Sequence, residues 1–328
     1  MKAFKIVFFL LGAFLFVWII RKMGVQELLT GFHTLGWRLI VPILILFPCQ
    51  LLQTGAWWLV VRRYHPGSVP FWGLFRVKIA GEAANTLTPL NFAGGDPVRI
   101  WLLSRQIPVP LSGASVIVDR TMQTLAIVAL IFLGNLAALF NLDFPSSTKR
   151  LLAITATSLL LVTAFFIFQQ TRGLFEKLVK LISRMKIRTF SEKTLSRIEE
   201  VDHQIGEFYR KDRGLFAVCF GLMLLSRLLA ISEIITLARF LGVPMDLWEG
   251  LFFAAVIPVT NLLGSLVPGT LGVLEGVVSA LFFALHWDPA QGLILQVARR
   301  LRAFVWILVG FFFIYQARRQ EKKIHPSG

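Results

Sequence analysis

The sequence has little cysteine, little histidine and little charge for its 328 residues. Its two cysteines, Cys49 and Cys219, lie inside apolar runs, so we interpret them as packing residues and predict no disulfide framework. The five histidines are scattered through loops and ends and are assigned no role. There is no GxxxxGK(S/T) nucleotide loop, no metal-ligand cluster and no nucleophile with a base at a recognisable spacing. We therefore predict no metal, no cofactor and no enzymatic activity.

Charged residues make up only 16% of the sequence, whereas apolar residues make up 56%. A soluble globule could not bury so much apolar side chain, so much of it must face lipid. Helices are the expected spanning element, because they satisfy their own backbone groups and these runs lack strand alternation. The net charge of +16 comes mainly from residues in loops that flank apolar runs. This distribution favours a charged membrane surface over nucleic acid as the partner.

Six apolar runs are long enough, or nearly so, to cross roughly 30 Å of hydrocarbon, namely 4–20, 38–61, 115–140, 150–170, 214–241 and 290–316. Two further regions, 71–107 and 247–287, are interrupted by TPLNFAGGDP and SLVPGTLG. Broken backbone at membrane depth must be buried in protein or line a wet cavity, so each region is predicted to be a helical hairpin. The breaks are assigned to Pro89, Gly94, Gly95, Pro268, Gly269 and Gly272, with the glycines permitting the turn or close helix packing.

Lysine and arginine accumulate in cytoplasmic loops, so their distribution predicts the orientation. The stretch 171–213 has eleven basic and seven acidic residues, and the tail is basic, so both are placed in the cytoplasm. Arg21, Lys22, Lys149 and Arg150 then lie outside, which makes the bias imperfect. We divide the chain into 1–170, with the first repeat at its core (38–140), a basic linker at 171–213, and 214–328 with the second repeat. The linker fits an amphipathic helix on the inner surface and a solvated connector equally well.

The most specific signal is an internal repeat with an offset of 179 residues, as between Pro89 and Pro268. At this offset Asp96, Pro110 and Arg120 recur as Glu275, Pro289 and Arg299. With the orientation above, the two copies cross the membrane in opposite directions. We therefore predict an all-α polytopic membrane protein of about six full spans and two broken hairpins, arranged as an inverted repeat. In transporters, such repeats place the substrate site between the copies, near the middle of the bilayer.

Several charges fall inside predicted spans, where an unpaired charge costs roughly 3 kcal/mol on insertion scales. A last span that began after Arg302 would be too short, so some of Arg299, Arg300 and Arg302 must lie within the membrane. Arg227 and Glu233 lie inside the run at 214–241. Two interpretations stay open. These groups form structural ion pairs with one another or with acids of the hairpins, or the guanidinium groups hold a phosphate through forked hydrogen bonds.

A second group of charges surrounds the first break, namely Glu82, Asp96, Arg99 and Asp119. Simple exposure at the interface is the alternative interpretation for them. Arg120 could also lie at the inner interface, and its selection as a substrate-binding candidate depends on its position in the repeat. We select as substrate-binding candidates Arg299, Arg302, Arg120, Asp96, Glu275, Arg99, Glu82 and Arg227.

Two segments carry a resemblance to a known family. GEAANTLTPLNFAGGDPVRIWLLSR is followed by a DR pair, and VPGTLGVLEG is followed by ARR. They resemble the transmembrane flippase domain of the lysylphosphatidylglycerol synthases, the multiple peptide resistance factors, and its stand-alone relatives. The resemblance covers nearly the whole chain, with Asp96 at a position where the family usually has Glu. It implies residence in the inner membrane and translocation of a phospholipid or lipid-linked headgroup. The soluble aminoacyl-transfer domain is not found, so synthesis of lysyl lipid is not expected.

The leading hypothesis is a flippase or scramblase in which Arg299, Arg302 and Arg120 draw the headgroup phosphate into a groove. Asp96 and Glu275 would contact a headgroup amine or exchange protons. The alternatives are a secondary transporter of a small anion and a noncatalytic accessory of an envelope lipid or glycan pathway. The expected partners are membrane lipids with an anionic headgroup, and a second copy of the chain or an envelope-synthesis protein stays open.

Overall fold

The computed structural model describes residues 30, 33–87, 94–170, 200–201, 204–206, 208–209, 211–267 and 270–324. The described residues form helices and no strands, which confirms the predicted all-α class. Within these described residues, four helical stretches are long and apolar enough to cross a membrane, at His33–Tyr64, Val109–Asn141, Ser146–Phe165 and Arg213–Phe240. The protein is a multi-pass membrane protein.

The long helices coincide with the predicted spans. They are α3 (Ile40–Tyr64), which follows the short 3-10 helix η1 (Gly36–Leu39), α6 (Val109–Asn141), α7 (Ser146–Gln170), α10 (Arg213–Phe240) and α13 (Pro289–Ile324). Helices α6 and α13 begin near Pro110 and Pro289, because proline is well accommodated in the first turn of a helix. The predicted span at 4–20 and most of the linker at 171–213 lie outside the described residues. The number of spans stays a prediction.

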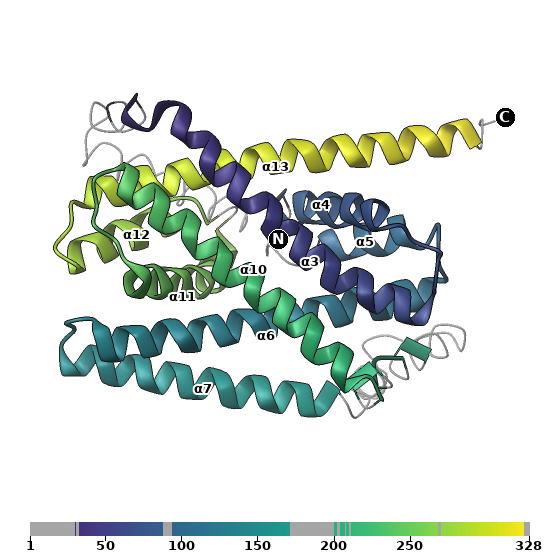
Figure 1. Cartoon of the computed structure of the whole chain (residues 1–328), viewed down its shortest axis with the longest axis horizontal. Helices are drawn as coiled ribbons and strands as arrows, with labels where there is room; N and C mark the ends of the chain where they lie inside the picture. Colours follow the sequence, from purple (N-terminus) through teal and green to yellow (C-terminus); the bar gives the residue numbers. More distant parts are fainter. Residues whose placement is uncertain are drawn as a thin grey trace.

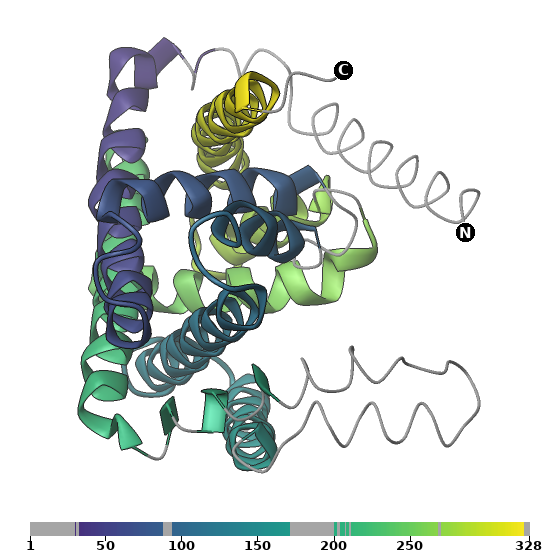
Figure 2. The same ribbon diagram turned by 90° about the vertical axis from the view of Figure 1, so that its right-hand side faces the viewer.

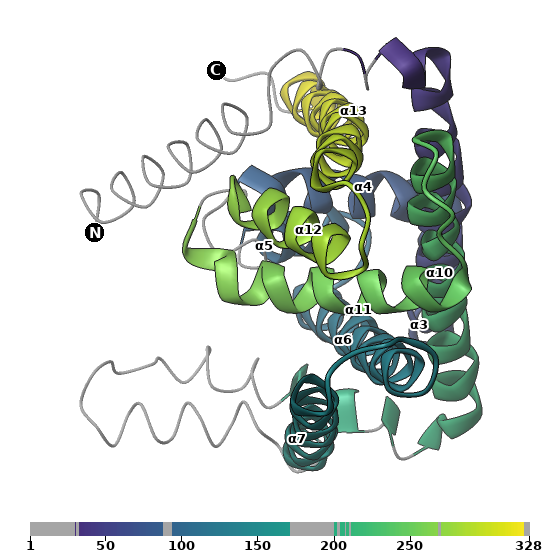
Figure 3. The ribbon, with the colours of Figure 1, turned by 90° about the vertical axis from the view of Figure 1, so that its left-hand side faces the viewer.

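Both interrupted regions form pairs of shorter helices. The first pair is α4 (Phe71–Leu87) and α5 (Gly95–Leu103), and the second is α11 (Leu247–Leu263) and α12 (Val273–Ala284), with the 3-10 helix η2 (Gly264–Leu266) after α11. The two hairpins occupy opposite ends of the bundle, so α4 and α5 face the viewer in Figure 2, and α11 and α12 do so in Figure 3.

Glycine is required at both breaks. The backbone N–H of Gly95 donates to Oδ1 of Asn85 at 2.6 Å, and a Cβ atom at Gly95 would overlap the carbonyl oxygen of Gly81. Gly272 has a φ of 76°, a conformation that favours glycine, and it lies directly before α12. Gly94 directly precedes α5. Of the other predicted break residues, Pro89, Pro268 and Gly269 lie outside the described residues.

The two halves of the chain contact each other reciprocally. Helix α3 packs along α10, α11 packs on α6, and α13 packs on α4. In Figure 1, α3 and α10 run in opposite directions along the same diagonal, and α6 and α13 run in opposite directions along the long axis. Each half therefore places its hairpin against the long helix of the other half. The inverted repeat itself stays a prediction.

Matching glycines allow the two close contacts between hairpins and long helices. A Cβ atom at Gly134 of α6 would lie 2.5 Å from the carbonyl oxygen of Leu251 and would also overlap Ala255, both on α11. A Cβ atom at Gly310 of α13 would lie 2.6 Å from the carbonyl oxygen of Ile79 and would also overlap Ala83, both on α4. Small residues permit such backbone approach between membrane helices.

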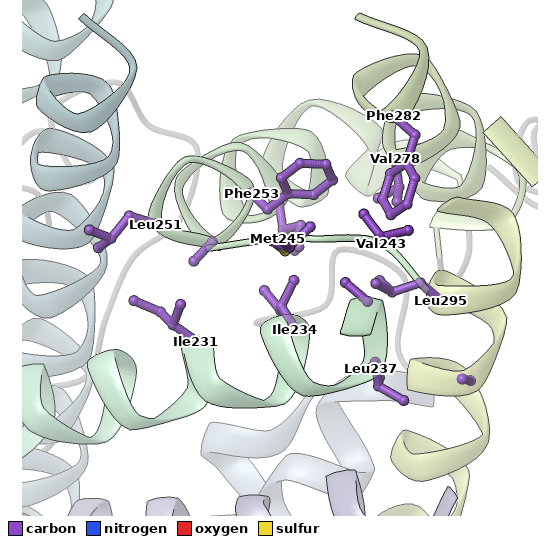
Figure 4. Packing of buried hydrophobic residues seen from close by; sticks show 14 of the residues in the cluster. Ile231, Ile234, Leu237, Val243, Met245, Leu251, Phe253, Val278, Phe282 and Leu295 are labelled. Atoms are coloured by element: carbon purple, nitrogen blue, oxygen red, sulfur yellow. The ribbon is translucent and has the colours of Figure 1, made fainter. Parts of the chain in front are cut away.

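An apolar core lies mainly in the second half of the chain and also includes Leu35, Leu130 and Ala137 of the first half (Figure 4). Side chains from α10, α11, α12 and α13 meet there, and Phe253 and Phe282 make an edge-to-face contact with ring centroids 5.4 Å apart. Helix α7 is different, because it packs mainly on α6 and buries almost none of its apolar residues. Helix α7 therefore presents an exposed apolar surface, which is expected to face lipid.

Candidate functional site

Two groups of charged side chains lie among the helices. We call the first the N-terminal ion cluster; it comprises Lys78, Glu82, Asp96, Arg99, Asp119 and Arg120 on α4, α5 and α6. The second, the C-terminal ion cluster, comprises Glu233, Glu275, Arg299, Arg300 and Arg302 on α10, α12 and α13. Each cluster joins a short hairpin helix to the long helix that follows it in sequence.

Arg99 is the anchor of the N-terminal ion cluster. Its side chain is 0% exposed, and its Nη1 donates to Oδ2 of Asp119 at 3.1 Å. The amide of Gln123 donates to the same carboxylate oxygen at 2.7 Å, and the guanidinium lies over the ring of Trp57. A Cβ atom at Gly81 would overlap Arg99, so α4 must have a glycine there. These contacts bury a paired charge, which is a structural role.

Lys78 is also fully buried, with a side chain that is 0% exposed. Its Nζ forms an ion pair with Glu82 and donates to Oε1 of Gln53 at 2.9 Å. Glu82 also accepts from Nε2 of Gln50 at 2.6 Å. Since Gln50 and Gln53 lie on α3, this network joins the first hairpin to the central helix pair.

Arg120 and Asp96 form the partly exposed edge of the same cluster, with side chains 27% and 26% exposed. Nε of Arg120 donates to both carboxylate oxygens of Asp96, at 2.8 and 2.9 Å, and Nη1 donates to Oε1 of Gln123 at 3.3 Å. Its Nη2 is buried and has no hydrogen-bond partner among the described residues. Asp96 therefore fixes the guanidinium while one donor stays unused.

The C-terminal ion cluster contains two separate pairings. Glu275 accepts from the backbone N–H of Gly272 at 2.9 Å and forms an ion pair with Arg300, which also donates to the carbonyl of Thr270 at 3.0 Å. Arg300 thereby ties α13 to the start of α12. Glu233, on α10, forms the second pairing.

Glu233 is 2% exposed and lies between two arginines of α13. It forms an ion pair with Nη1 of Arg302, and its Oε1 lies 3.5 Å from Nε of Arg299. Both arginine side chains are 14% exposed. One carboxylate therefore compensates two guanidinium groups.

Ser226 joins α3 to α10 between the two clusters. Its hydroxyl donates to the carbonyl of Cys49 at 3.1 Å and accepts from Nε2 of Gln53 at 2.8 Å. Gln53 in turn accepts from Lys78, so hydrogen bonds run from the first hairpin to the second half of the chain.

Arg227, the next residue on α10, differs from the other arginines named above. It lies one turn after Met223 and two turns before Ile234, both buried, so it is on an inward-facing side of the helix. It interacts electrostatically with Glu82, Asp119 and Arg120. Among the described residues, no carboxylate lies within ion-pair distance of its guanidinium.

Counted over the described residues, the two clusters and Arg227 contain seven cations and five carboxylates. The N-terminal ion cluster is balanced, with three of each sign. The C-terminal ion cluster has one cation in excess, and Arg227 adds another. A surplus of partly buried positive charge favours the binding of an anion.

Comparison with known proteins agrees with this membrane architecture. Residues 3–310 match the family model described as the lysylphosphatidylglycerol synthase TM region. The chain belongs to this family. It is also 26% identical over 249 residues to a UPF0104 membrane protein of Methanothermobacter thermautotrophicus, and the match covers 72% of each chain. The resemblance inferred from the two sequence segments is thus confirmed.

The residues that the sequence indicated as substrate-binding candidates lie in different surroundings in the structure. Glu82, Asp96, Arg99 and Arg120 come together in the N-terminal ion cluster. Arg299 and Arg302 meet at Glu233, whereas Glu275 pairs with Arg300. Their roles in substrate binding stay predictions.

Sequence reasoning missed several polar residues of the site, namely Lys78, Gln50, Gln53 and Gln123. The four-residue spacing of Lys78 and Glu82 was a usable signal, because it places both on one helix face. The glutamines had no such signal, since their partners lie on other helices.

Proposed function

We propose that this protein translocates a phospholipid or lipid-linked anionic headgroup between the leaflets of the inner membrane, as a flippase or scramblase. In this proposal the 171–213 linker and the C-terminus lie in the cytoplasm. The protein acts on its lipid without changing a covalent bond.

The carrying observation is the excess of cations over carboxylates in the two ion clusters and Arg227, which include residues of α6 and α10, two helices long and apolar enough to cross a membrane. Charges in hydrocarbon are costly, so such a surplus is expected at a substrate or ion pathway. An anionic headgroup would compensate the surplus while its acyl chains stay among the lipids.

The reciprocal packing of the halves supports a way to move the headgroup. Each hairpin rests on the long helix of the other half, through Gly134 in one case and Gly310 in the other. Inverted repeats of transporters rock against each other around a fixed central site. A similar motion here would turn the cationic centre from one leaflet to the other.

The test uses the purified full chain in vesicles that contain phosphatidylglycerol with a fluorescent nitrobenzoxadiazole label. Dithionite quenches the outer leaflet only, so lipid exchange raises the quenched fraction from about one half towards completeness. Mass spectrometry of the recovered lipid checks that it is unaltered. Protein-dependent quenching of unaltered lipid is expected. Uptake of radiolabelled phosphate without lipid movement, or a chemically changed lipid, would contradict the proposal.

A further inference from the structure

We infer that Arg227 of α10 and Arg120 of α6 together form a binding site for a phosphoryl group. The first observation is their placement: α10 packs on α6, with Met223 and Met122 in one apolar cluster, and the like charges of Arg227 and Arg120 interact across this contact. Two like charges held together in a partly buried place are relieved by an anion that binds both. The site thus draws one arginine from each half.

The second observation is the state of the hydrogen-bond donors. Asp96 and Gln123 occupy Nε and Nη1 of Arg120, and its buried Nη2 has no partner among the described residues. The guanidinium of Arg227, which is partly buried, lacks an ion-pair partner there. A buried donor without a partner, such as Nη2 of Arg120, is rare in proteins and usually marks a site for a ligand, ion or water.

The third observation is the arrangement of the remaining charges. Glu233 already compensates Arg299 and Arg302, and Glu275 compensates Arg300, so each arginine of α13 has a carboxylate that competes with an anionic ligand. Arg227 has no such competitor. The structure thus moves the principal binding role from Arg299 and Arg302, which the sequence favoured, to Arg227.

The ligand chemistry follows from the donors. A guanidinium binds phosphate oxygens through two parallel N–H bonds, and two such groups match the several oxygens of a phosphoryl group. A lipid phosphodiester and free inorganic phosphate share this chemistry. The inference deepens the proposed function, because it names the group of the substrate that the centre binds.

The test measures binding apart from transport. Native mass spectrometry of the purified chain would quantify retention of phosphatidylglycerol by wild type, Arg227→Gln and Arg213→Gln. Arg213 is an exposed arginine on the same helix and is the matched control. Affinity is expected to fall about tenfold in Arg227→Gln, as for loss of one charged hydrogen-bonding partner, and to be unchanged in Arg213→Gln. Diacylglycerol, which has no phosphate, should show no dependence on Arg227.

Two further variants keep the result interpretable if Arg227→Gln fails to fold. Arg227→Lys retains the charge but loses the fork, and Arg120→Lys retains a cation beside Asp96 but loses Nη2. Each variant should bind phosphatidylglycerol severalfold more weakly than wild type, while its thermal unfolding is unchanged. Displacement of the lipid by millimolar inorganic phosphate would identify free phosphate as a ligand, whereas no displacement would identify the lipid as the source.

Equal retention by wild type and folded Arg227 variants, or no retention by wild type of phosphatidylglycerol or phosphate, would overturn the inference. Binding that depends on Arg227 without lipid movement in vesicles would support the inference and contradict the proposed function. The two claims can therefore fail separately.

Discussion

The two ion clusters occupy comparable places in the two halves, yet they are built differently. In the N-terminal ion cluster, fully buried Lys78 and Arg99 are matched by acids and glutamines. In the C-terminal ion cluster, three arginines share two acids and lie partly exposed. The difference indicates that Lys78, Arg99 and their partners mainly hold helices together, whereas the surplus of positive charge comes from the C-terminal ion cluster and Arg227. Charge balance separates the two roles better than burial does.

The largest effect should come from breaking the balanced cluster. Asp119→Ala leaves Arg99 buried without its closest carboxylate, and removal of one member of a buried pair costs about 3–5 kcal/mol of unfolding free energy. Thermal unfolding in detergent would measure the loss. Asp143→Ala, in an exposed connection, is the control and should be neutral. If the Asp119→Ala protein were as stable as wild type, the N-terminal ion cluster would have no structural role.

Glu233→Gln should have a smaller effect on stability and an added effect on binding. Its arginine partners are partly exposed, so we expect a loss of about 2 kcal/mol. Because Arg299 and Arg302 also lose their compensating carboxylate, retention of phosphatidylglycerol should rise severalfold. Thermal unfolding and native mass spectrometry would measure the two effects. A stability loss larger than that of Asp119→Ala would reverse the assignment of roles.

The glycine contacts at Gly134 and Gly310 are expected to contribute equally to the stability of the two halves. Gly134→Ala and Gly310→Ala each place a methyl group against a backbone carbonyl, so each should lose about 1–2 kcal/mol of unfolding free energy. At Gly221 on α10 an added methyl group has no neighbour within 4 Å, so Gly221→Ala should gain up to about 1 kcal/mol of unfolding free energy. Thermal unfolding would compare the three variants. Effects of very different size at Gly134 and Gly310 would argue against equivalent contacts.

The smallest effect concerns an ion pair outside the spans. The hydroxyl of Tyr64 donates to Asp212 at 2.8 Å, and Arg63 pairs with the same carboxylate at 3.0 Å, which together lower the pKa of Asp212. A lowered folded-state pKa contributes stability above the unfolded value of about 3.9, and this contribution is lost as pH falls through the folded value. Wild type should therefore lose slightly more thermal stability than Asp212→Asn between pH 6 and pH 3. Identical pH profiles would show that the contact contributes nothing.

Much of the fold could be predicted from hydropathy and from the glycines and prolines that interrupt the apolar runs. The helices α3, α6, α7, α10 and α13 follow apolar runs, and Gly95 and Gly272 mark the hairpin breaks. These features are local, because a helix that spans lipid must satisfy its own backbone groups.

Partner choice could not be predicted in the same way. The 179-residue offset aligned Arg120 with Arg299, yet Asp96 pairs with Arg120 while Glu275 pairs with Arg300. One residue along a helix turns a side chain by roughly 100°, so small differences between the copies change the partner. Arg227 was a candidate from the sequence, but its lack of an ion-pair partner among the described residues became evident only from the structure.

The proposed function requires that the two halves of the chain cross the membrane in opposite directions. The connection between α3 and α4 contains Ser68, and the corresponding connection between α10 and α11 contains Pro244. In a background with Cys49→Ala and Cys219→Ala, the variants Ser68→Cys and Pro244→Cys would be labelled in sealed vesicles with a membrane-impermeant maleimide. Labelling from opposite faces of the membrane is predicted, and labelling of both cysteines from the same face would contradict the opposite orientation of the two halves.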